Sequence, residues 1–506
     1  MKCSVSKANL QAIRGDVLIL SLFENEEMTD PLMKEVDRCL KGWITKLLKD
    51  KEFRGKAHER EWIHVPAGLG VKRILLVGLG SKKKFRIDMA RRVAGTAARE
   101  ISHKRFGKVT SFIHGAGSTD FPCKTLAQAV VEGTAIGEYQ FEIYKTGEAS
   151  SQKTKIQSIH LLAPKGESSS LLNASVQKGS VLAECQNRAR DLINTPANII
   201  TPKRLAEIAR EEARHWGLKI KIFGLPEIKR LRMGGLLNVG QGSENPPQFV
   251  VLEHTGKRRN TPPFVVVGKG ITFDSGGLSL KPSNSMETMK YDKAGAVATL
   301  YTLVAAARLK VSQRVVGLMA IAENLPSGKA YKPGDVVRTM SKKTIEVLNT
   351  DAEGRVVLSD ALSYAERYKP KGVIDIATLT GACIIALGYE ATGMMGREKD
   401  SNEIKTGLEK AGEFTGERVW ELPLWEEYNE AIKSSIADIK NVGNRAAGTI
   451  TAAAFLGHFT EKYPWVHLDI AGTGWNEESK PYLSKGPTGV GVRLITEYLL
   501  SLEDGA

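Results

Sequence analysis

The chain has 506 residues, of which 42% are hydrophobic and 25% are charged, and its formal net charge is +15. This composition is typical of a globular protein, and the length is enough for two or three domains. It excludes a low-complexity chain, and no apolar run reaches the roughly 18 residues that a membrane span needs.

The cysteines predict a reducing compartment. They are five in number, scattered and never spaced as CxxC. This argues against a disulfide framework and against a thiolate zinc site. The N-terminus has no uninterrupted apolar stretch, because Arg14 and Asp16 break it. We therefore expect no signal peptide and a cytoplasmic protein.

The first third of the chain alternates apolar runs with charged helical stretches. We predict strands at Asp16–Phe23 and Arg73–Val77, an amphipathic helix at Met89–Lys104 and a polar loop at Lys145–Lys155. This pattern indicates a mixed α/β domain. The basic excess is concentrated here, most of all in Val71–Arg92. Such a patch could follow the phosphate backbone of DNA, or it could be a solvated basic face.

A helix over residues 168–192 is predicted to connect this region to the rest of the chain. We place the domain boundary inside it, so that residues 1–172 form a non-catalytic N-terminal α/β domain and residues 173–506 a catalytic domain. Thr201 and Pro202 are typical of the N-cap and first turn of the next helix.

The second part of the chain contains nearly continuous apolar runs separated by helical stretches. They are Phe264–Gly270, Val315–Ala322, Thr344–Thr350, Gly372–Gly381 and Trp465–Gly474. Such runs favour a central mixed, mostly parallel sheet flanked by helices. The predicted fold class is therefore α/β, with a smaller N-terminal α/β domain and a larger C-terminal catalytic domain. Ligands on such sheets bind beyond the carboxyl ends of the strands.

Common cofactor and nucleophile motifs are missing from the sequence. After the predicted strand LLVGLG, Lys83 stands where a dinucleotide-binding fingerprint has its third glycine. The sequence contains no GxxxxGK[ST] phosphate loop, no GxSxG nucleophile elbow and no HExxH zinc motif. A metal site in this chain would therefore depend on oxygen ligands.

Three segments of the second part gather acidic and basic residues. They are VGKGITFDSGGLSLKP with Lys269, Asp274 and Lys281, METMKYDKAGAVATL with Asp292, and NTDAEGRVVLSDAL with Asp351, Glu353 and Arg355. Alone, the acids of the last segment could cap a helix, act as acid and base, or bind metal. Converging carboxylates repel by roughly 4 kcal/mol per pair at ~4 Å, and divalent ions remove that cost. Together the segments favour a two-metal hydrolytic site.

VGKGITFDSGG, MKYDKAGA and NTDAEGRV resemble the signature of the leucyl aminopeptidase (cytosol aminopeptidase) family of two-metal peptidases. Val356 stands where leucine is usual, and Lys293 where many members carry methionine, which adds a charge close to the site. The resemblance continues through NTPANIITP, ATLTGA, HLDIAGTGW and KGPTGVGVRLITEYL and covers residues 190–500. The first third resembles the family only loosely.

The resemblance implies an aminopeptidase that releases leucine and similar residues from peptide N-termini. It implies that one metal is bound by Lys269, Asp274, Asp292 and Glu353. It implies that the other is bound by Asp274, Asp351 and Glu353, so that Asp274 and Glu353 bridge. The metals implied are Mn²⁺ or Zn²⁺, with Mg²⁺ or Co²⁺ as alternatives.

The resemblance also implies the remaining site residues. The catalytic side chains are Lys281 and Arg355, with bicarbonate near Arg355 as proton acceptor. The substrate-binding residues are Met289, Thr378, Leu379, Gly381 and Ala471. We expect Gly354 to let the turn enter its helix without blocking that anion.

The resemblance further implies a cytoplasmic homohexamer with inward-facing sites, and a second role in DNA binding, as in some bacterial members. Two other readings of the residues stay open. The carboxylate cluster would also permit a two-metal phosphoesterase or nuclease, and the basic first third would permit an architectural DNA-binding protein. A carboxylate-pair glycosidase does not explain Lys269.

Overall fold

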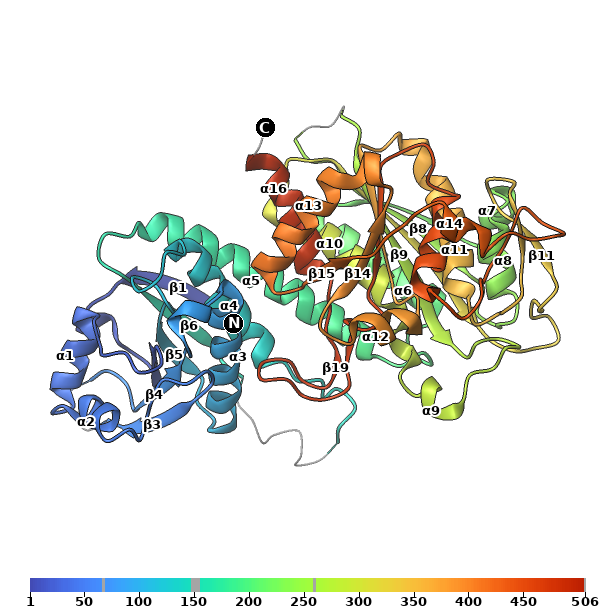
Figure 1. Cartoon of the computed structure of the whole chain (residues 1–506). Coiled ribbons are helices and arrows are strands. Elements are labelled where there is room, and N and C mark those ends of the chain that lie inside the picture. Colours follow the sequence, from blue (N-terminus) through green and yellow to red (C-terminus); the bar gives the residue numbers. More distant parts are fainter. Residues whose placement is uncertain (66–68, 147–154, 258–260, 505–506) are drawn as a thin grey trace. The chain divides into compact units, whose positions relative to one another are not determined.

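The structure, a computed structural model, describes residues 1–65, 69–146, 155–257 and 261–504, and most of the predicted loop Lys145–Lys155 lies outside them. The chain divides into two units (Figure 1). Unit 1 comprises Met1–Asn187 and Glu477–Lys485, and unit 2 the remainder. The division falls within helix α5 (Ser169–Asn194), the predicted connector. The boundary between residues 172 and 173 stays a prediction.

Unit 1 is built on a six-stranded sheet in the order β1-β6-β5-β2-β4-β3. Its strands are β1 (Lys2–Lys7), β2 (Val17–Leu22), β3 (Arg60–His64), β4 (Arg73–Gly78), β5 (Lys108–Phe112) and β6 (Ser158–Ala163). Its helices besides α5 are α1 (Pro31–Cys39), α2 (Trp43–Lys49), α3 (Ile87–His103) and α4 (Cys123–Gly137). All neighbouring strands are parallel except β3, which is antiparallel to β4. The predicted mixed α/β character of this region is confirmed.

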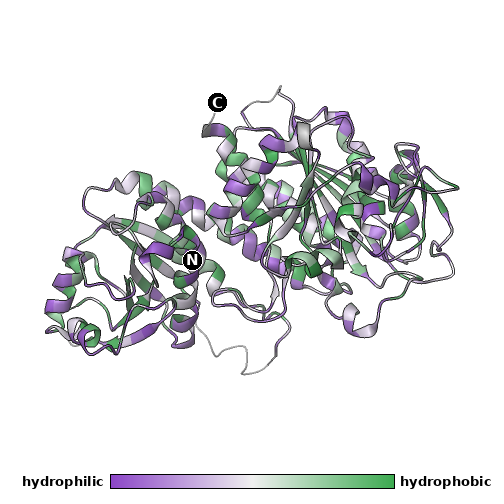
Figure 2. Cartoon of the chain, viewed as in Figure 1, coloured by the Kyte–Doolittle hydropathy of each residue, from purple (hydrophilic) through white to green (hydrophobic). Residues whose placement is uncertain are grey.

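Unit 2 contains an eight-stranded sheet in the order β15-β14-β17-β13-β9-β10-β8-β7. The strands are β7 (Lys219–Phe223), β8 (Gln248–His254), β9 (Phe264–Asp274), β10 (Val315–Asn324), β13 (Gly372–Ala377), β14 (Thr392–Gly396), β15 (Val419–Glu421) and β17 (Trp465–Asp469). The middle four, β17, β13, β9 and β10, are parallel. Figure 2 shows these central strands as hydrophobic along their length, which fits a sheet that is buried on both faces.

Helices cover both faces of this sheet. On one side lie α6 (Pro202–Trp216), α10 (Ala294–Leu309), α13 (Glu398–Thr415) and α16 (Val492–Asp504). On the other lie α8 (Gly234–Gly240), α11 (Glu353–Ala365) and α15 (Gly448–Gly457). As predicted, Thr201 caps α6, because its side chain accepts a hydrogen bond from the Arg204 amide.

Shorter elements complete unit 2. They are α7 (Leu225–Arg230), α9 (Ser283–Met286), η4 (Met289–Lys293), η5 (Glu366–Tyr368), α12 (Gly381–Leu387), α14 (Glu427–Glu430), β11 (Val336–Arg338), β12 (Thr344–Glu346), β16 (Ile439–Lys440), β18 (Trp475–Asn476) and β19 (Gly486–Pro487). Within the described part of the chain, no helix is both long and apolar enough to cross a membrane.

The alternation of side chains along β9 decides how the site is built. A side chain at Gly268 would collide with helix α10, because its Cβ would lie 2.4 Å from the Gly295 carbonyl oxygen. The missing side chain lets α10 pack closely on this face. The next residue, Lys269, points to the opposite face, where α11 begins. β9 thus places the Lys269 side chain beside the first turn of α11.

One predicted strand belongs to a different sheet. We expected Thr344–Thr350 to join the main sheet, but only β12 is extended, and it pairs with β11 and β16 in a separate three-stranded sheet. Beyond β12, the Leu348 amide donates to the Asn441 side chain rather than to a strand. Asp351 and Glu353 therefore reach the site from outside the main sheet.

A buried histidine in unit 1 predicts a loss of stability in acid. His114 is fully buried after β5, and neither ring nitrogen has a hydrogen-bond partner among the described residues. Burial lowers the pKa of His114 from its ordinary value to about 4. Protonation therefore favours the unfolded chain, so stability is lost as pH falls below the ordinary histidine pKa of about 6.5.

The difference between the folded and unfolded pKa of His114 predicts that the free energy of unfolding of unit 1 falls by about 2 kcal/mol from pH 7.5 to pH 5. His114→Phe should remove this part of the pH dependence, while His64→Gln, at an exposed histidine, should not. The measurement is the amide hydrogen-exchange protection of β5, with each variant compared with wild type at both pH values. Equal pH dependence in His114→Phe and wild type would contradict this assignment.

Candidate active site

The candidate site lies at the edge of the main sheet where the four parallel strands end. Asp274 is the last residue of β9, and Asp469 the last of β17, while Thr378 directly follows β13. Since parallel strands present their carboxyl ends at one edge, these residues come together. A cavity of about 610 Å³ opens at this edge.

The predicted site residues converge on this cavity. Those that line it are Lys269, Asp274, Lys281, Met289, Asp292, Asp351, Arg355, Thr378, Leu379, Gly381 and Ala471. The remaining one, Glu353, lies directly behind, with only 1% of its surface exposed. The structure thus brings all of them together, although they come from separate parts of the chain.

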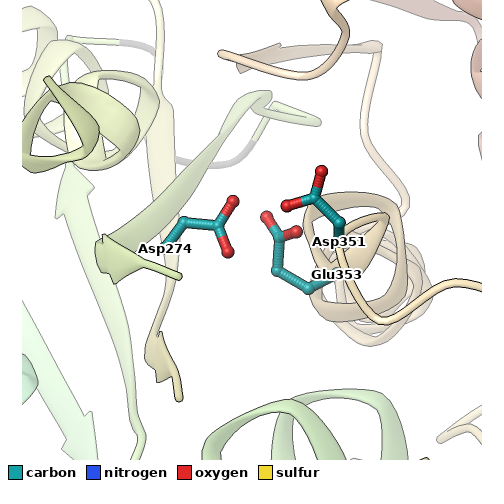
Figure 3. A group of neighbouring side chains, drawn as sticks. All are labelled: Asp274, Asp351 and Glu353. Carbon is teal, nitrogen blue, oxygen red and sulfur yellow. The ribbon is translucent and has the colours of Figure 1, made fainter. Parts of the chain in front are cut away.

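Three carboxylates form the centre of the site. Asp274, Asp351 and Glu353 each offer an oxygen, and these oxygens lie within 4.8 Å of one another. Figure 3 shows the three groups pointing toward one another, Asp274 from the end of β9, Glu353 from the first residue of α11 and Asp351 from the turn just before that helix. Asp292, from η4, is buried nearby and accepts a 2.6 Å hydrogen bond from the Thr378 hydroxyl.

Lys269 reaches into this cluster from β9. Its Nζ lies 2.8 Å from both Asp292 Oδ1 and Glu353 Oε1 and donates to the Thr378 carbonyl oxygen at 2.8 Å. Burial disfavours the ammonium, but the charges of the nearby carboxylates outweigh it and hold the pKa of Lys269 above its ordinary value. The lysine is fixed at three points inside the carboxylate cluster.

Gly354 makes room for this lysine. A Cβ at Gly354 would lie 2.7 Å from Lys269 Cε and 2.8 Å from its Nζ. We expected the glycine to leave space for an anion beside Arg355, and the structure shows that it leaves space for Lys269. The end of the Lys269 side chain can lie against the first turn of α11 in this position because Gly354 has no side chain.

The carboxylates are poorly compensated by protein groups. Burial and the charge of Asp274 raise the pKa of Glu353 to about 8, and they also raise the pKa of Asp351. Apart from the nearby Lys269 ammonium, neither oxygen of Glu353 has a hydrogen-bond partner among the described residues, and Asp292 Oδ2 has none. Buried acceptors of this kind cost free energy unless something binds them. The donor set, carboxylates with one amine, fits divalent metal ions.

Lys281 closes the cluster on the cavity side. Its Nζ lies 2.9 Å from Asp274 Oδ2 and 2.5 Å from Asp351 Oδ1. Burial disfavours its ammonium, but the charges of Asp274, Glu353 and Asp351 outweigh it and hold the pKa of Lys281 above its ordinary value. Lys281 is therefore charged at neutral pH and faces the space where a substrate would lie.

Arg355 is a buried cation with an unused donor. Its Nη1 donates to the Asn441 carbonyl oxygen at 2.9 Å, while its Nε has no hydrogen-bond partner among the described residues. Burial lowers the pKa of Arg355 to about 10, so it stays charged at neutral pH. A guanidinium with an unused N–H beside a cavity suits a small planar anion.

Several organising residues were not predicted as site residues. Asp469 accepts hydrogen bonds from the amides of Leu379 and Ala471 and so shapes the wall formed by these two predicted substrate-binding residues. The Asn441 side chain accepts a hydrogen bond from the Leu348 amide, and its backbone carbonyl oxygen accepts one from Arg355. In the sequence, the one sign that Asp469 belongs to the site is its position at the end of an apolar strand run.

Lys293 turns away from the cavity. It is fully buried, and its Nζ donates to the carbonyl oxygens of Thr195 and Lys290 at 2.9 and 2.6 Å. Burial lowers the pKa of Lys293 to about 7. Its side chain anchors η4, which carries Asp292, to the segment that precedes α6.

Known proteins are similar to this chain in sequence and in fold. Residues 19–148 match the model of the cytosol aminopeptidase family's N-terminal domain, and residues 187–496 match that of its catalytic domain. A probable cytosol aminopeptidase of Geotalea uraniireducens (strain Rf4) is 46% identical over 93% of both chains. One of Geobacter sulfurreducens (strain ATCC 51573 / DSM 12127 / PCA) is 44% identical over 99% of both chains.

Two solved structures are similar over nearly the whole length. A tomato leucine aminopeptidase variant has a TM-score of 0.87 and 31% identity, covering 99% of this chain and 96% of its own. The bottromycin maturation enzyme BotP in complex with Mn has a TM-score of 0.85 and 31% identity, covering 96% of this chain and 99% of its own. The chain therefore belongs to the cytosol aminopeptidase family and is an aminopeptidase, a hydrolase of peptides.

Proposed function

We propose that the chain is a two-metal aminopeptidase that releases leucine and similar residues from peptides with a free N-terminus. The main support is the cluster of the buried Asp274 and Glu353 with the half-buried Asp351, whose oxygens face one another with too few protein donors. A similar structure is described as a complex with Mn. Manganese or zinc is therefore the proposed metal, with magnesium and cobalt as alternatives.

The residues divide into two overlapping ligand sets. Lys269, Asp274, Asp292 and Glu353 would hold one ion, and Asp274, Asp351 and Glu353 the other. Lys269 would have to bind as the neutral amine, at a cost of roughly 4–5 kcal/mol for a lysine deprotonated near pH 7. When bound, two divalent ions polarise the peptide carbonyl and lower the pKa of the attacking water.

The chain's own cations would complete the chemistry. Lys281 is charged and faces the cavity, so its ammonium would stabilise the negative charge that develops on the peptide carbonyl oxygen. Arg355 would hold bicarbonate through its guanidinium at the cavity wall, and a proton of the attacking water would pass to that anion. Arg355 itself cannot accept the proton, because it remains charged.

The cavity wall would select the substrate. Met289, Thr378, Gly381 and Ala471 would surround the first side chain, and the Leu379 carbonyl would orient the peptide. The free α-amino group, with a pKa of about 7.7–8.0, would provide a neutral amine for metal binding. This requirement would restrict cleavage to the first peptide bond.

The proposal includes a cytoplasmic homohexamer with inward-facing sites. Exposed apolar side chains of unit 2 support an assembly, since Ile385 of α12 is 90% exposed and Trp425 is 54% exposed. The cysteines fit a reducing compartment, because none of the five forms a disulfide within the described residues. DNA binding by the basic segment Val71–Arg92 stays a prediction. A salt-dependent mobility shift that survives Asp351→Asn would support it.

A panel of substrates and a substitution of one proposed metal ligand together test the function. The chain should hydrolyse leucyl-p-nitroanilide and leave both its N-acetylated form and p-nitrophenyl phosphate intact. Asp351→Asn should lower kcat/KM by at least roughly 100-fold, which corresponds to about 2.7 kcal/mol. Asp400→Asn, at an exposed aspartate of α13, is the matched control and should retain activity. Phosphatase activity that requires Asp351 would instead identify a phosphoesterase.

Gly354→Ala should impair catalysis without unfolding the chain. The new Cβ would push against the end of Lys269, which cannot move without losing its contacts to Asp292 and Glu353. We expect kcat/KM to fall by at least roughly tenfold, about 1.4 kcal/mol. Gly328→Ala is the control, because a Cβ there would meet nothing within 4 Å. Equal activity of both variants would show that Lys269 is not held as described.

Bicarbonate should stimulate the enzyme through Arg355. In buffer freed of bicarbonate, wild type should lose activity and recover it when bicarbonate is added, because the buried guanidinium has a free N–H for the anion. Arg355→Met should be slow and insensitive to the addition. The measurement is initial rate against bicarbonate concentration at constant pH. A wild-type rate that does not respond would remove this role.

A further inference from the structure

The parallel neighbours β9 and β10 of unit 2 end with a shift in register. Ile271 of β9 pairs with Ala322 of β10, and the next pair is Asp274 with Asn324. Between these pairs β9 has one residue more than β10, so the shift is a bulge. Without it, Phe273 would lie opposite Asn324. Bulges beside active sites often redirect a side chain, and here the bulge sets Asp274 level with Asn324.

Asn324 uses both of its amide protons in this place. It is fully buried, and its Nδ2 donates to Asp274 Oδ1 at 2.8 Å and to the Thr350 carbonyl oxygen at 2.9 Å. Its own Oδ1 has no hydrogen-bond partner among the described residues. The orientation of the amide is therefore determined, because the reverse orientation would set its oxygen against two acceptors.

The backbone around Asn324 is also fixed. Its carbonyl oxygen accepts hydrogen bonds from both the amide and the hydroxyl of Ser275, at 3.0 and 2.7 Å. Ser275 directly follows Asp274. The end of β10 and the loop after β9 are thus tied by backbone as well as by side chain.

These bonds make the two oxygens of Asp274 different. Oδ1 accepts from Asn324 Nδ2 and from the Gly276 amide at 2.9 Å, so both of its lone pairs are engaged. Oδ2 has neither bond and lies 2.9 Å from Lys281 Nζ at the cavity. Two neutral N–H donors thus hold Oδ1, while Oδ2 points into the cluster with Lys281 as its ion-pair partner.

We propose that Asn324 is a positioning residue, which fixes Asp274 so that Oδ2 alone is offered to a divalent cation. The inference rests on the proposed metal site and deepens it, because it gives the shared ligand a single fixed donor atom. Groups that orient metal ligands typically change metal affinity by roughly 10- to 100-fold. Asn324 therefore belongs functionally to the metal site, although it does not line the cavity.

A merely structural role for Asn324 makes a different prediction. The Thr350 carbonyl oxygen also accepts a 2.8 Å hydrogen bond from the Tyr331 hydroxyl. If Asn324 served only to brace the segment before Asp351, then Tyr331→Phe would remove an equivalent brace and have an equivalent effect. Only Asn324 contacts Asp274 as well, so the two variants separate the two roles.

The test is calorimetric titration of the full chain, stripped of metal, with Mn²⁺. Asn324→Leu should weaken Mn²⁺ binding by roughly 10- to 100-fold. Tyr331→Phe should bind nearly as wild type does. Asn238→Ala, which removes an amide hydrogen bond on α8 in the same unit, should also match wild type. Circular dichroism melts establish that each variant is folded, and Asn324→Ser carries the same prediction if the leucine variant does not fold.

Two results would overturn the assignment. One is wild-type affinity in a folded Asn324 variant, while Glu353→Gln loses Mn²⁺. The other is an equal loss in Tyr331→Phe, which would place the effect in the brace. If Glu353→Gln itself binds Mn²⁺ as wild type does, the proposed metal site is wrong, and the role of Asn324 is overturned with it.

Discussion

Buried negative charge at the edge of the main sheet is the constraint on which the rest of the site depends. Asp274, Asp292 and Glu353 are each less than 5% exposed, and Asp351 lies beside them. Carboxylates this close in a poorly hydrated place repel one another strongly. Two lysines, Lys269 and Lys281, offset part of that charge. Oxygens that still lack donors leave the cluster suited to divalent ions.

The fold brings these groups together through small features of the backbone. Parallel strands place the ends of β9, β13 and β17 at one edge, and the side-chain alternation of β9 sends Lys269 toward α11. Gly354 lets the lysine pass, and the bulge sets Asp274 beside Asn324. None of these features contributes a metal ligand, yet each determines where a ligand atom lies. Substitutions at such positions would therefore affect activity without touching the substrate.

Much of the fold could be predicted from the sequence, because the signals are local. Apolar runs such as Val315–Ala322 and Gly372–Gly381 predicted strands, and their alternation with helices predicted the parallel centre. The same signal failed for Thr344–Thr350, since an apolar run shows that a strand is buried but not which sheet it joins. Here only β12 is extended, and it pairs with short neighbours.

The gathering of the acidic segments could also be predicted, because charged motifs after strands meet at one edge. The supporting residues could not. Asn324, Asn441 and Asp469 act through hydrogen bonds to residues far along the chain, and an asparagine at a strand end has no distinctive pattern. Gly354 was noticed, but its neighbour Lys269 is distant in sequence, so its purpose became clear only from the packing.

We propose that the carboxylate cluster holds two divalent ions. The most direct measurement is a crystal structure of the chain with Mn²⁺ and an anomalous difference map at the manganese absorption edge. We expect two peaks, both in contact with Asp274 and Glu353, one also with Lys269 and Asp292 and the other with Asp351. A single peak, or peaks away from these side chains, would contradict it.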